Sequence, residues 1–149
     1  MLKFSKKVEY ALIALLYLED SKEEFVSAKE IGRRFQIPQD ILGKVLQSLS
    51  GAKILGSIRG SRGGYYLLKP LEEISVHEVV SAVDRPINLV DCADEEGCQC
   101  AQASFCNIQN PMLVLQEKLV RFFSQLTLKD LKKELPLPIQ SYFSKPTCQ

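Results

Sequence analysis

Four of the chain's five cysteines fall within one short stretch, DCADEEGCQCAQASFC at residues 91–106. They are Cys92, Cys98, Cys100 and Cys106. In a reducing compartment, clustered thiols are more often metal ligands or redox groups than structural disulfides. We therefore expect this acidic, turn-rich stretch to be a loop that performs metal ligation or thiol redox chemistry.

Acidic side chains surround these thiols, namely Asp91, Asp94, Glu95 and Glu96. Negative charge raises the pKa of a thiol, whereas a bound cation reverses that penalty. The charge therefore favours a metal over a low-pKa reactive cysteine. Three alternatives remain open: an iron–sulfur cluster, zinc, and redox thiols that can form a disulfide. The spacing C-x5-C-x-C-x5-C disfavours zinc, because structural zinc sites usually pair cysteines as C-x2–4-C.

The bulk composition fits one ordinary domain, or a small domain with an extension used for association, because 46% of the 149 residues are hydrophobic. The net charge of +1 is unevenly spread. Residues 1–70 carry 12 Lys and Arg against 7 Asp and Glu, whereas residues 71–149 carry 7 against 11. A basic amino-terminal half suits a polyanionic partner such as DNA.

The first residues, MLKFSKKVEYALIALLYLEDS, predict an amphipathic helix from Ser5 to about Leu18. Glu9 interrupts the outline of a signal peptide, and no cleavage site follows. No apolar run is long enough to span a membrane, so the expected location is the cytoplasm. The buried stripe of this helix is expected to be Val8, Leu12, Leu15 and Leu16.

Residues 27–52 predict a helix-turn-helix. Ser27 and Glu30 form an S-x-x-E capping box for a short helix, and Pro38 suits the first position of the next helix. The expected inward residues are Ala28, Ile31 and Phe35 of the first helix and Ile41, Leu42, Val45, Leu46 and Leu49 of the second. The exposed first turns of the second helix would enter the DNA major groove.

A glycine-rich hairpin follows, with strands expected at 54–59 and 65–69 and GSRGG at its tip. Arginine on a thin glycine loop can enter the minor groove. The order of parts predicts a winged helix, and a winged helix used for protein contacts is the alternative. The candidate DNA contacts are Lys6, Lys7, Ser27, Gln39, Asp40, Gly43, Lys44, Gln47, Arg59, Ser61 and Arg62. Gly43, which costs about 1 kcal/mol within a helix, either allows close approach to DNA or is merely tolerated.

The carboxy-terminal half predicts two more helices and a role in association. Ser75 and Glu78 form a second capping box, for a helix that runs to about Val83. Pro111 begins a long helix whose apolar residues are spaced 3, 4, 3, 4, the pattern of a helix that pairs with a partner helix. They are Met112, Leu115, Leu119, Phe122 and Leu126. We expect a homodimer built on this helix, the alternative being a helix folded back on its own domain.

The expected fold is mainly α with a small β-hairpin wing: a winged helix-turn-helix followed by a long dimerisation helix. Four segments are expected. Residues 1–85 form the DNA-binding domain and residues 86–110 the cysteine-rich loop. Residues 111–135 hold the dimerisation helix and a short following helix, and residues 136–149 form a tail that contains the fifth cysteine, Cys148.

With these parts in this order, the chain resembles the IscR/NsrR-type family of iron–sulfur-sensing winged-helix transcription regulators. The resemblance covers residues 1 to about 135, and its start is most similar to the branch that regulates iron–sulfur assembly genes. It rests on FSKKVEYALIALLYL, SAKEIGRRFQIPQDILGKVLQSL, IRGSRGGYYLLK and the cysteine loop. It implies a homodimer that binds a double-stranded DNA operator under the control of a [2Fe–2S] or [4Fe–4S] cluster.

The resemblance also implies a ligand set. Three cysteines bind the cluster in that family, and the fourth ligand varies. By position, Cys92, Cys98 and Cys106 match the three, and Cys100 can take the place of Cys98. The position of the family's histidine ligand falls on Gln109, a poor ligand for iron. The remaining candidates for the fourth ligand are, in order, Cys100, Glu9 from the partner's first helix and His77.

Two other functions compete with this one. A winged-helix regulator without a cluster would respond to zinc, thiol oxidation, a small molecule or a partner protein. An enzyme or electron carrier is the third hypothesis. The sequence disfavours it, because no nucleophile–base pair, paired carboxylates or phosphate-binding loop is visible. We therefore expect no enzymatic activity.

Overall fold

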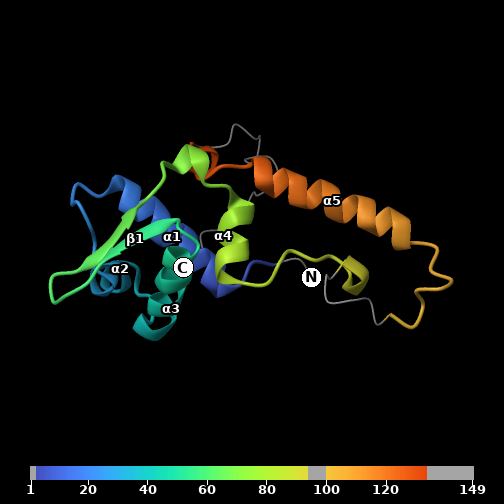
Figure 1. The fold of residues 1–149 in the computed structure, drawn as a ribbon, viewed down its shortest axis with the longest axis horizontal. Coiled ribbons are helices and arrows are strands. Elements are labelled where there is room, and N and C mark those ends of the chain that lie inside the picture. The colour runs from blue at the N-terminus through green and yellow to red at the C-terminus, as the bar shows by residue number, and fades with distance from the viewer. Residues whose placement is uncertain (1–2, 94–99, 134–149) are drawn as a thin grey trace, which may run out of the picture.

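A computed structural model describes residues 3–93 and 100–133. Within them it contains six α-helices, two 3-10 helices and one two-stranded antiparallel sheet. The α-helices are α1 (Lys6–Asp20), α2 (Ala28–Phe35), α3 (Gln39–Gly51), α4 (Val76–Val83), α5 (Gln109–Gln125) and α6 (Leu128–Lys132). The strands are β1 (Leu55–Ile58) and β2 (Gly64–Leu67), and the 3-10 helices are η1 (Leu71–Glu73) and η2 (Asp91–Ala93). The expected mainly α winged helix with a long carboxy-terminal helix is confirmed (Figure 1).

The core of the fold is a single cluster of apolar side chains drawn mainly from α1, α3 and α4. In α1 the buried residues are Val8, Ala11, Ala14, Leu15 and Leu18. Leu12 and Leu16, expected in this stripe, are only half-buried, because the small Ala11 and Ala14 take the innermost positions. The alanines let α1 approach α3 and α4 closely, which makes α1 the central support of the body.

The serine caps expected for α2 and α4 are both present, but neither forms the full reciprocal box. Ser27 Oγ accepts a hydrogen bond from the Glu30 N–H at 3.2 Å, and Ser75 Oγ accepts one from the Glu78 N–H at 3.1 Å. The two glutamates are used elsewhere: Glu30 accepts from the Tyr17 hydroxyl, and Glu78 pairs with Lys69. Each carboxylate thus ties its helix to a neighbouring segment.

The helix-turn-helix is formed by α2, a left-handed residue and α3. Gln36 has a φ of 54°, and Ile37 N–H donates to the Gly32 carbonyl. α3 begins at Gln39, one residue after the expected start, with Pro38 at its N-cap. Two residues expected to be inward are exposed. Ile41 lies at the edge of the buried stripe of α3, and Phe35, at the end of α2, packs edge-on against the Tyr17 ring.

The wing is a short hairpin in which Leu55 pairs with Leu67 and Ile58 with Gly64. Its strands cover 55–58 and 64–67, slightly different from the expected ranges. On the other edge of β2, Val26 exchanges two backbone hydrogen bonds with Tyr65, both of 2.9 Å. Because Val26 immediately precedes the N-cap of α2, this bridge ties the wing to the helix-turn-helix.

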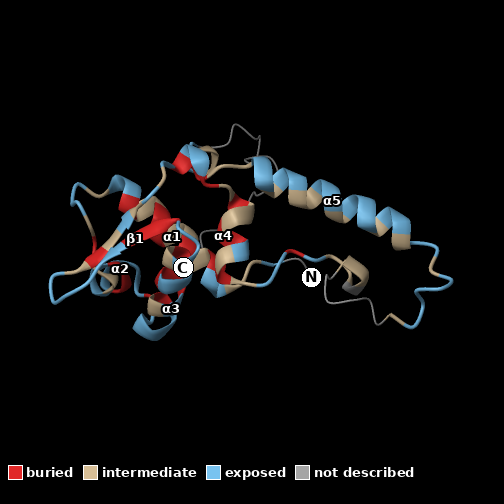
Figure 2. Cartoon of the chain, in the orientation of Figure 1, coloured by how far each residue is buried: buried red, intermediate tan, exposed pale blue. Residues whose placement is uncertain are grey.

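The long helix α5 lies beside α4 and extends away from the rest of the body (Figure 1). It begins at Gln109, two residues before Pro111. The proline is tolerated there, because N–H groups of the first turn have no partner within the helix. None of its 17 residues is buried, as the absence of red along it in Figure 2 shows.

Candidate functional site

The exposed side of α3 carries the polar residues expected to contact DNA. Gln39, Asp40, Lys44 and Gln47 are exposed, and Gly43 is half-buried among them. The opposite side of the helix is held in the core by Leu42, Val45, Leu46 and Leu49. Since a helix cannot rotate without exposing such a stripe, the polar side is fixed outward.

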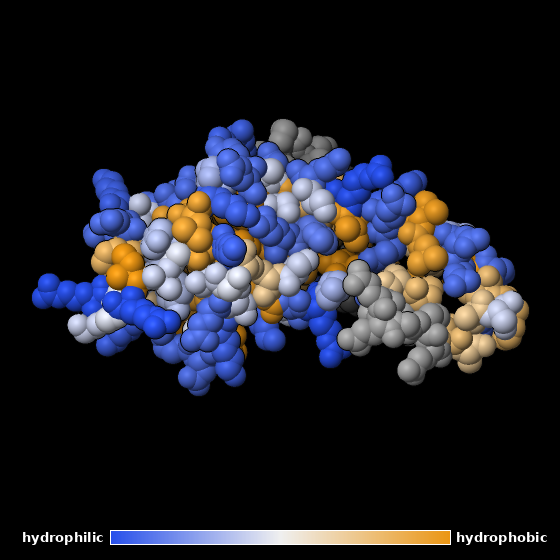
Figure 3. Space-filling view, viewed as in Figure 1, coloured by the Kyte–Doolittle hydropathy of each residue, from blue (hydrophilic) through white to orange (hydrophobic). Residues whose placement is uncertain are grey.

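The wing tip carries Arg59, Ser61 and Arg62, all exposed. Gly60 has a φ of 120°, a conformation that a residue with a side chain rarely adopts. The Gly63 N–H donates to the Gly60 carbonyl at 3.1 Å and closes the turn. Figure 3 shows hydrophilic surface around this tip, at the left of the molecule.

A hollow of about 480 Å³ lies where α3 faces the wing. Gln47 of α3 and Arg59 of the wing both line it, so the structure brings together two elements that the sequence could only place in order. Ala28, Ser57 and Tyr65 also line it and were not predicted. Ser27, next to Ala28, is half-buried and its hydroxyl caps α2.

Two exposed cations of α2 were also missed. Lys29 and Arg33 are one helical turn apart and both are exposed. Their spacing of four residues, in the helix that precedes α3, is the signal by which the sequence could have identified them. In a helix-turn-helix, the first helix crosses the DNA backbone, so these side chains suit phosphate contacts.

The amino end of α1 carries the expected lysines in different settings. Lys7 is exposed. Lys6 Nζ lies 2.5 Å from Glu9 Oε2, and the hydrogen bond to Glu9 raises the pKa of Lys6 above its ordinary value. Glu9, a candidate for the fourth metal ligand, is therefore held by a lysine of its own chain.

Three of the four clustered thiols line one cavity of about 430 Å³. They are Cys92 at η2 and Cys100 and Cys106 on the segment that leads into α5; Cys98 lies outside the described residues. Apolar side chains complete much of the lining: Leu89, Val90, Ile108 and Met112. The structure thus brings thiols from both ends of the loop to the amino end, or foot, of α5.

The donors of this cavity suit iron–sulfur ligation in their chemistry, since soft thiolates in an apolar setting are the usual ligands of such clusters. Cys100 Sγ lies 3.2 Å from Gln102 Oε1. Within residues 3–93 and 100–133, no three His, Cys, Asp or Glu side chains are already gathered as a metal site. Of the proposed fourth ligands, Cys100 lines the cavity, whereas Glu9 and His77 do not.

A glutamine of α5 holds the chain that leads into the cysteine loop. Gln116 Oε1 accepts a hydrogen bond from the Leu89 N–H at 2.8 Å, and Gln116 Nε2 donates to the Ile87 carbonyl. The side-chain amide thus pairs with the backbone much as a neighbouring strand would. These two hydrogen bonds connect residues 87–89 directly to α5.

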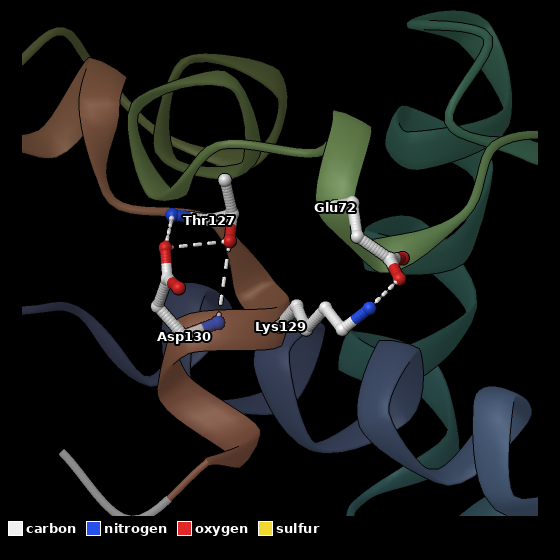
Figure 4. Close-up of polar contacts among 4 residues, drawn as sticks. All are labelled: Glu72, Thr127, Lys129 and Asp130. Carbon is white, nitrogen blue, oxygen red and sulfur yellow. Dashed lines mark hydrogen bonds and ion pairs between the residues drawn. The ribbon is translucent and has the colours of Figure 1, made fainter.

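The other end of α5 is anchored by backbone and side chains together. Val76 N–H donates to the Leu126 carbonyl, and Leu128 N–H donates to the Ile74 carbonyl, both at 2.9 Å. Thr127 and Asp130 form a full capping box, which holds α6 in place (Figure 4). Lys129 pairs with Glu72 of η1, and Lys132 with Asp20 of α1.

Replacing Thr127 with alanine is expected to destabilise the fold by about 1 kcal/mol, the usual cost of losing a helix cap. Hydrogen bonds from Thr127 lower the pKa of Asp130 below its ordinary 3.8. A lowered carboxyl pKa contributes stability above 3.8 that is lost as pH falls through the folded-state value. In urea unfolding, the free energy of unfolding of Thr127→Ala should therefore be lower than that of wild type at pH 7. The gap between the two proteins should become smaller below pH 3.8.

The matched control is Ser124→Ala, one turn earlier. Its exposed hydroxyl bonds only to the Val120 carbonyl of its own helix, so its unfolding midpoint should stay near wild type at both pH values. A Thr127→Ala protein as stable as Ser124→Ala at pH 7 would contradict the role of the cap.

The apolar residues expected at a dimer interface divide into two groups. Leu119 and Leu126 pack against the core of their own chain. Leu115 and Phe122 are 48% and 57% exposed, and Ile108, seven residues before Leu115, is 55% exposed. These three form an exposed apolar row at heptad spacing, and Figure 3 shows apolar patches over α5. Met112, the remaining member of the expected set, is half-buried.

Across the described residues, none of the helices has both the length and the apolar character needed to cross a membrane.

Known proteins share this sequence and architecture. The NsrR transcriptional regulator of Oceanobacillus iheyensis is 32% identical over 136 residues, which cover 89% of this chain and 90% of that protein. The fold matches CymR, the global cysteine regulator of B. subtilis, with a TM-score of 0.66 at 24% identity over 88% of this chain and 96% of that one. It also matches T. potens IscR, with a TM-score of 0.66 at 20% identity over 97% and 94%.

These likenesses confirm the resemblance to IscR/NsrR-type regulators. Residues 4–134 match the family model named Rrf2, described as an iron-dependent transcriptional regulator. That match spans the winged helix, the cysteine loop, α5 and α6. The chain is a member of the Rrf2 family of transcriptional regulators.

Proposed function

We propose that the protein is a homodimeric, DNA-binding regulator of the cytoplasm whose DNA affinity is set by an iron–sulfur cluster in its cysteine loop. The observation that carries this proposal is the cavity at the foot of α5, where Cys92, Cys100 and Cys106 face one apolar space. Three thiols that are separated along the chain and gathered around one apolar cavity suit the ligation of an iron–sulfur cluster.

DNA would be bound by α3 and the wing together. The exposed Gln39, Lys44 and Gln47 can bond to base edges or phosphates in the major groove. Arg59 and Arg62 can reach an adjacent minor groove. The Val26–Tyr65 bridge supports this arrangement, because it keeps the wing at a constant position relative to α2 and α3.

Dimerisation would be provided by α5. None of the 17 residues of this helix is buried within its own chain, although helices in proteins owe most of their stability to the packing of an apolar face. Pairing two copies along Ile108, Leu115 and Phe122 would cover the exposed row. Two-fold symmetry would then present two copies of α3 to two half-sites of an operator.

The cluster, when bound, would supply a redox-active and chemically labile centre. The chain's own residues do the rest. Cys92, Cys98 and Cys106 would provide three thiolates, Cys100 the fourth, and the apolar lining would limit access of water. Ligation by the partner subunit's Glu9 is the alternative fourth bond, and it would compete with the contact between Glu9 and Lys6.

Loss of the cluster would reach the DNA-binding elements through residues 87–89. Leu89 lines the cysteine cavity and also a second cavity of about 310 Å³ against the start of α1. Gln116 connects the same segment to α5. Rearrangement of the loop would therefore shift α1 and α5, and with them the separation of the two recognition helices.

The test begins with anaerobic purification and a visible spectrum, with iron and sulfide counts on the same sample. We expect a coloured protein with iron matched by sulfide. Its affinity for a selected duplex should fall with salt and change when the cluster is removed. Bound zinc would instead support the cluster-free regulator. A protein that stays colourless after incubation with iron and sulfide would overturn the cluster proposal.

A further inference from the structure

We propose that Gly43 is a point of close approach between α3 and duplex DNA, where a side chain would hold the helix away from the groove. The inference rests on the proposed DNA binding and adds a residue that determines how deeply the helix sits. It concerns a contact made by backbone rather than by a side chain, and of the two expectations for Gly43 it selects close approach to DNA.

The first observation is that Gly43 has no conformational reason to be glycine. It lies within α3, and among the described glycines only Gly60 has a positive φ. Alanine adopts helical angles at least as readily and is favoured there. A glycine at this position therefore weakens the helix that the protein depends on for recognition.

The second observation is that Gly43 has no packing reason to be glycine. A Cβ built at this position meets nothing within 4 Å. Other glycines of the same region do have such a reason. At Gly32 a Cβ would lie 1.8 Å from Gln39 Nε2, and at Gly64 it would lie 2.7 Å from the Val26 backbone. The space beside Gly43 is open in the free chain.

The third observation is the position of that open space. Asp40 lies three residues before Gly43, Lys44 follows it and Gln47 lies four residues after it, and all three are exposed. Residues three and four apart share one face of a helix. Gly43 thus lies on the same face of α3 as Asp40 and Gln47, which flank a bare stretch of backbone, and Lys44 is the next residue along the helix. A base edge can approach that backbone to van der Waals contact.

The test compares Gly43→Ala with Gly51→Ala, a matched control at the carboxyl end of α3. A Cβ at Gly51 also meets nothing within 4 Å, and Gly51 is exposed. Both substitutions should leave Tm unchanged or raise it by up to about 3 °C, because alanine favours the helix. Thermal melts therefore exclude misfolding as the cause of any loss of binding.

Affinity is then measured on a duplex that the wild-type protein selects from a randomised library, and on an unrelated duplex of the same length. Gly43→Ala should lose about tenfold or more on the selected duplex, since displacing the helix weakens its base contacts. It should change little on the unrelated one, and Gly51→Ala should match wild type on both. A further variant, Gly43→Leu, should lose more than Gly43→Ala.

Binding of the selected duplex by Gly43→Ala within about twofold of wild type would overturn the inference while leaving DNA binding intact. An equal loss in Gly51→Ala would also overturn it, since the effect would then belong to α3 as a whole. Failure of the wild-type protein to enrich any duplex would overturn the proposed DNA binding itself, and this inference with it.

Discussion

Replacing Phe122 with lysine is expected to convert a dimer into a monomer without unfolding the chain. Phe122 is 57% exposed in the single chain, so about half of the ~2 kcal/mol for burying a phenylalanine is at stake in each copy. Two-fold symmetry doubles that loss, and a lysine in the interface adds the cost of burying its charge. The dissociation constant of the dimer should rise by at least about 100-fold.

Sedimentation velocity over a range of protein concentrations measures this change. Val114→Lys is the matched control, because Val114 is also on α5 and 52% exposed but lies one residue before Leu115, on another side of the helix. It should remain dimeric. The Phe122→Lys protein should also lose most of its affinity for a palindromic duplex. If Phe122→Lys remains a dimer, the exposed row is not the interface.

Replacing Cys106 with alanine is expected to remove the iron and the visible absorption of the anaerobically purified protein. Cys106 lines the cysteine cavity together with Cys92 and Cys100. Loss of one of four thiolates leaves an open coordination position and a labile cluster. Iron and sulfide per subunit should both fall to near zero, whereas circular dichroism should stay unchanged, since Cys106 lies outside the core cluster.

The control substitution is Cys148→Ala, which removes the cysteine outside the clustered set and should leave iron content unchanged. Cys100→Ala and Glu9→Gln then test the first two candidates for the fourth ligand. Loss of iron in Cys100→Ala alone identifies a cluster held within one chain. Loss in Glu9→Gln alone identifies a cluster shared with the partner. If the Cys106→Ala protein keeps its full iron content, the cluster is not held in this cavity.

The order of elements could be predicted because each carries a local signal. Serine caps preceded α2 and α4, proline preceded α3, and glycines marked the hairpin. The partners of the side chains could not be predicted in the same way. The glutamates after Ser27 and Ser75 had the spacing of capping boxes, yet Tyr17 and Lys69 compete for them. The full box occurs at Thr127, where the third residue is aspartate.

The cysteine cavity shows the same limit. The thiols and their shared site could be predicted, because four cysteines in one loop are a local pattern of the sequence. It had no sign of Gln116, which reaches backbone 27 residues earlier in the chain. Nor did it divide the apolar residues of α5, since one heptad pattern contains both Leu119, which packs inward, and Phe122, which is exposed.

Because α5 is anchored at its carboxyl end, a tilt at that end displaces its amino end the most. Seventeen residues at about 1.5 Å each give an arm of about 25 Å. The anchor point is the Ser75–Thr127 bridge, and the cysteine cavity lies at the amino end of α5. A tilt of about 10° at this anchor point corresponds to a displacement of about 4 Å at the cavity. If loss of a cluster displaced this end of α5 by a few ångströms, we would therefore expect only a slight rotation of the helix relative to the body.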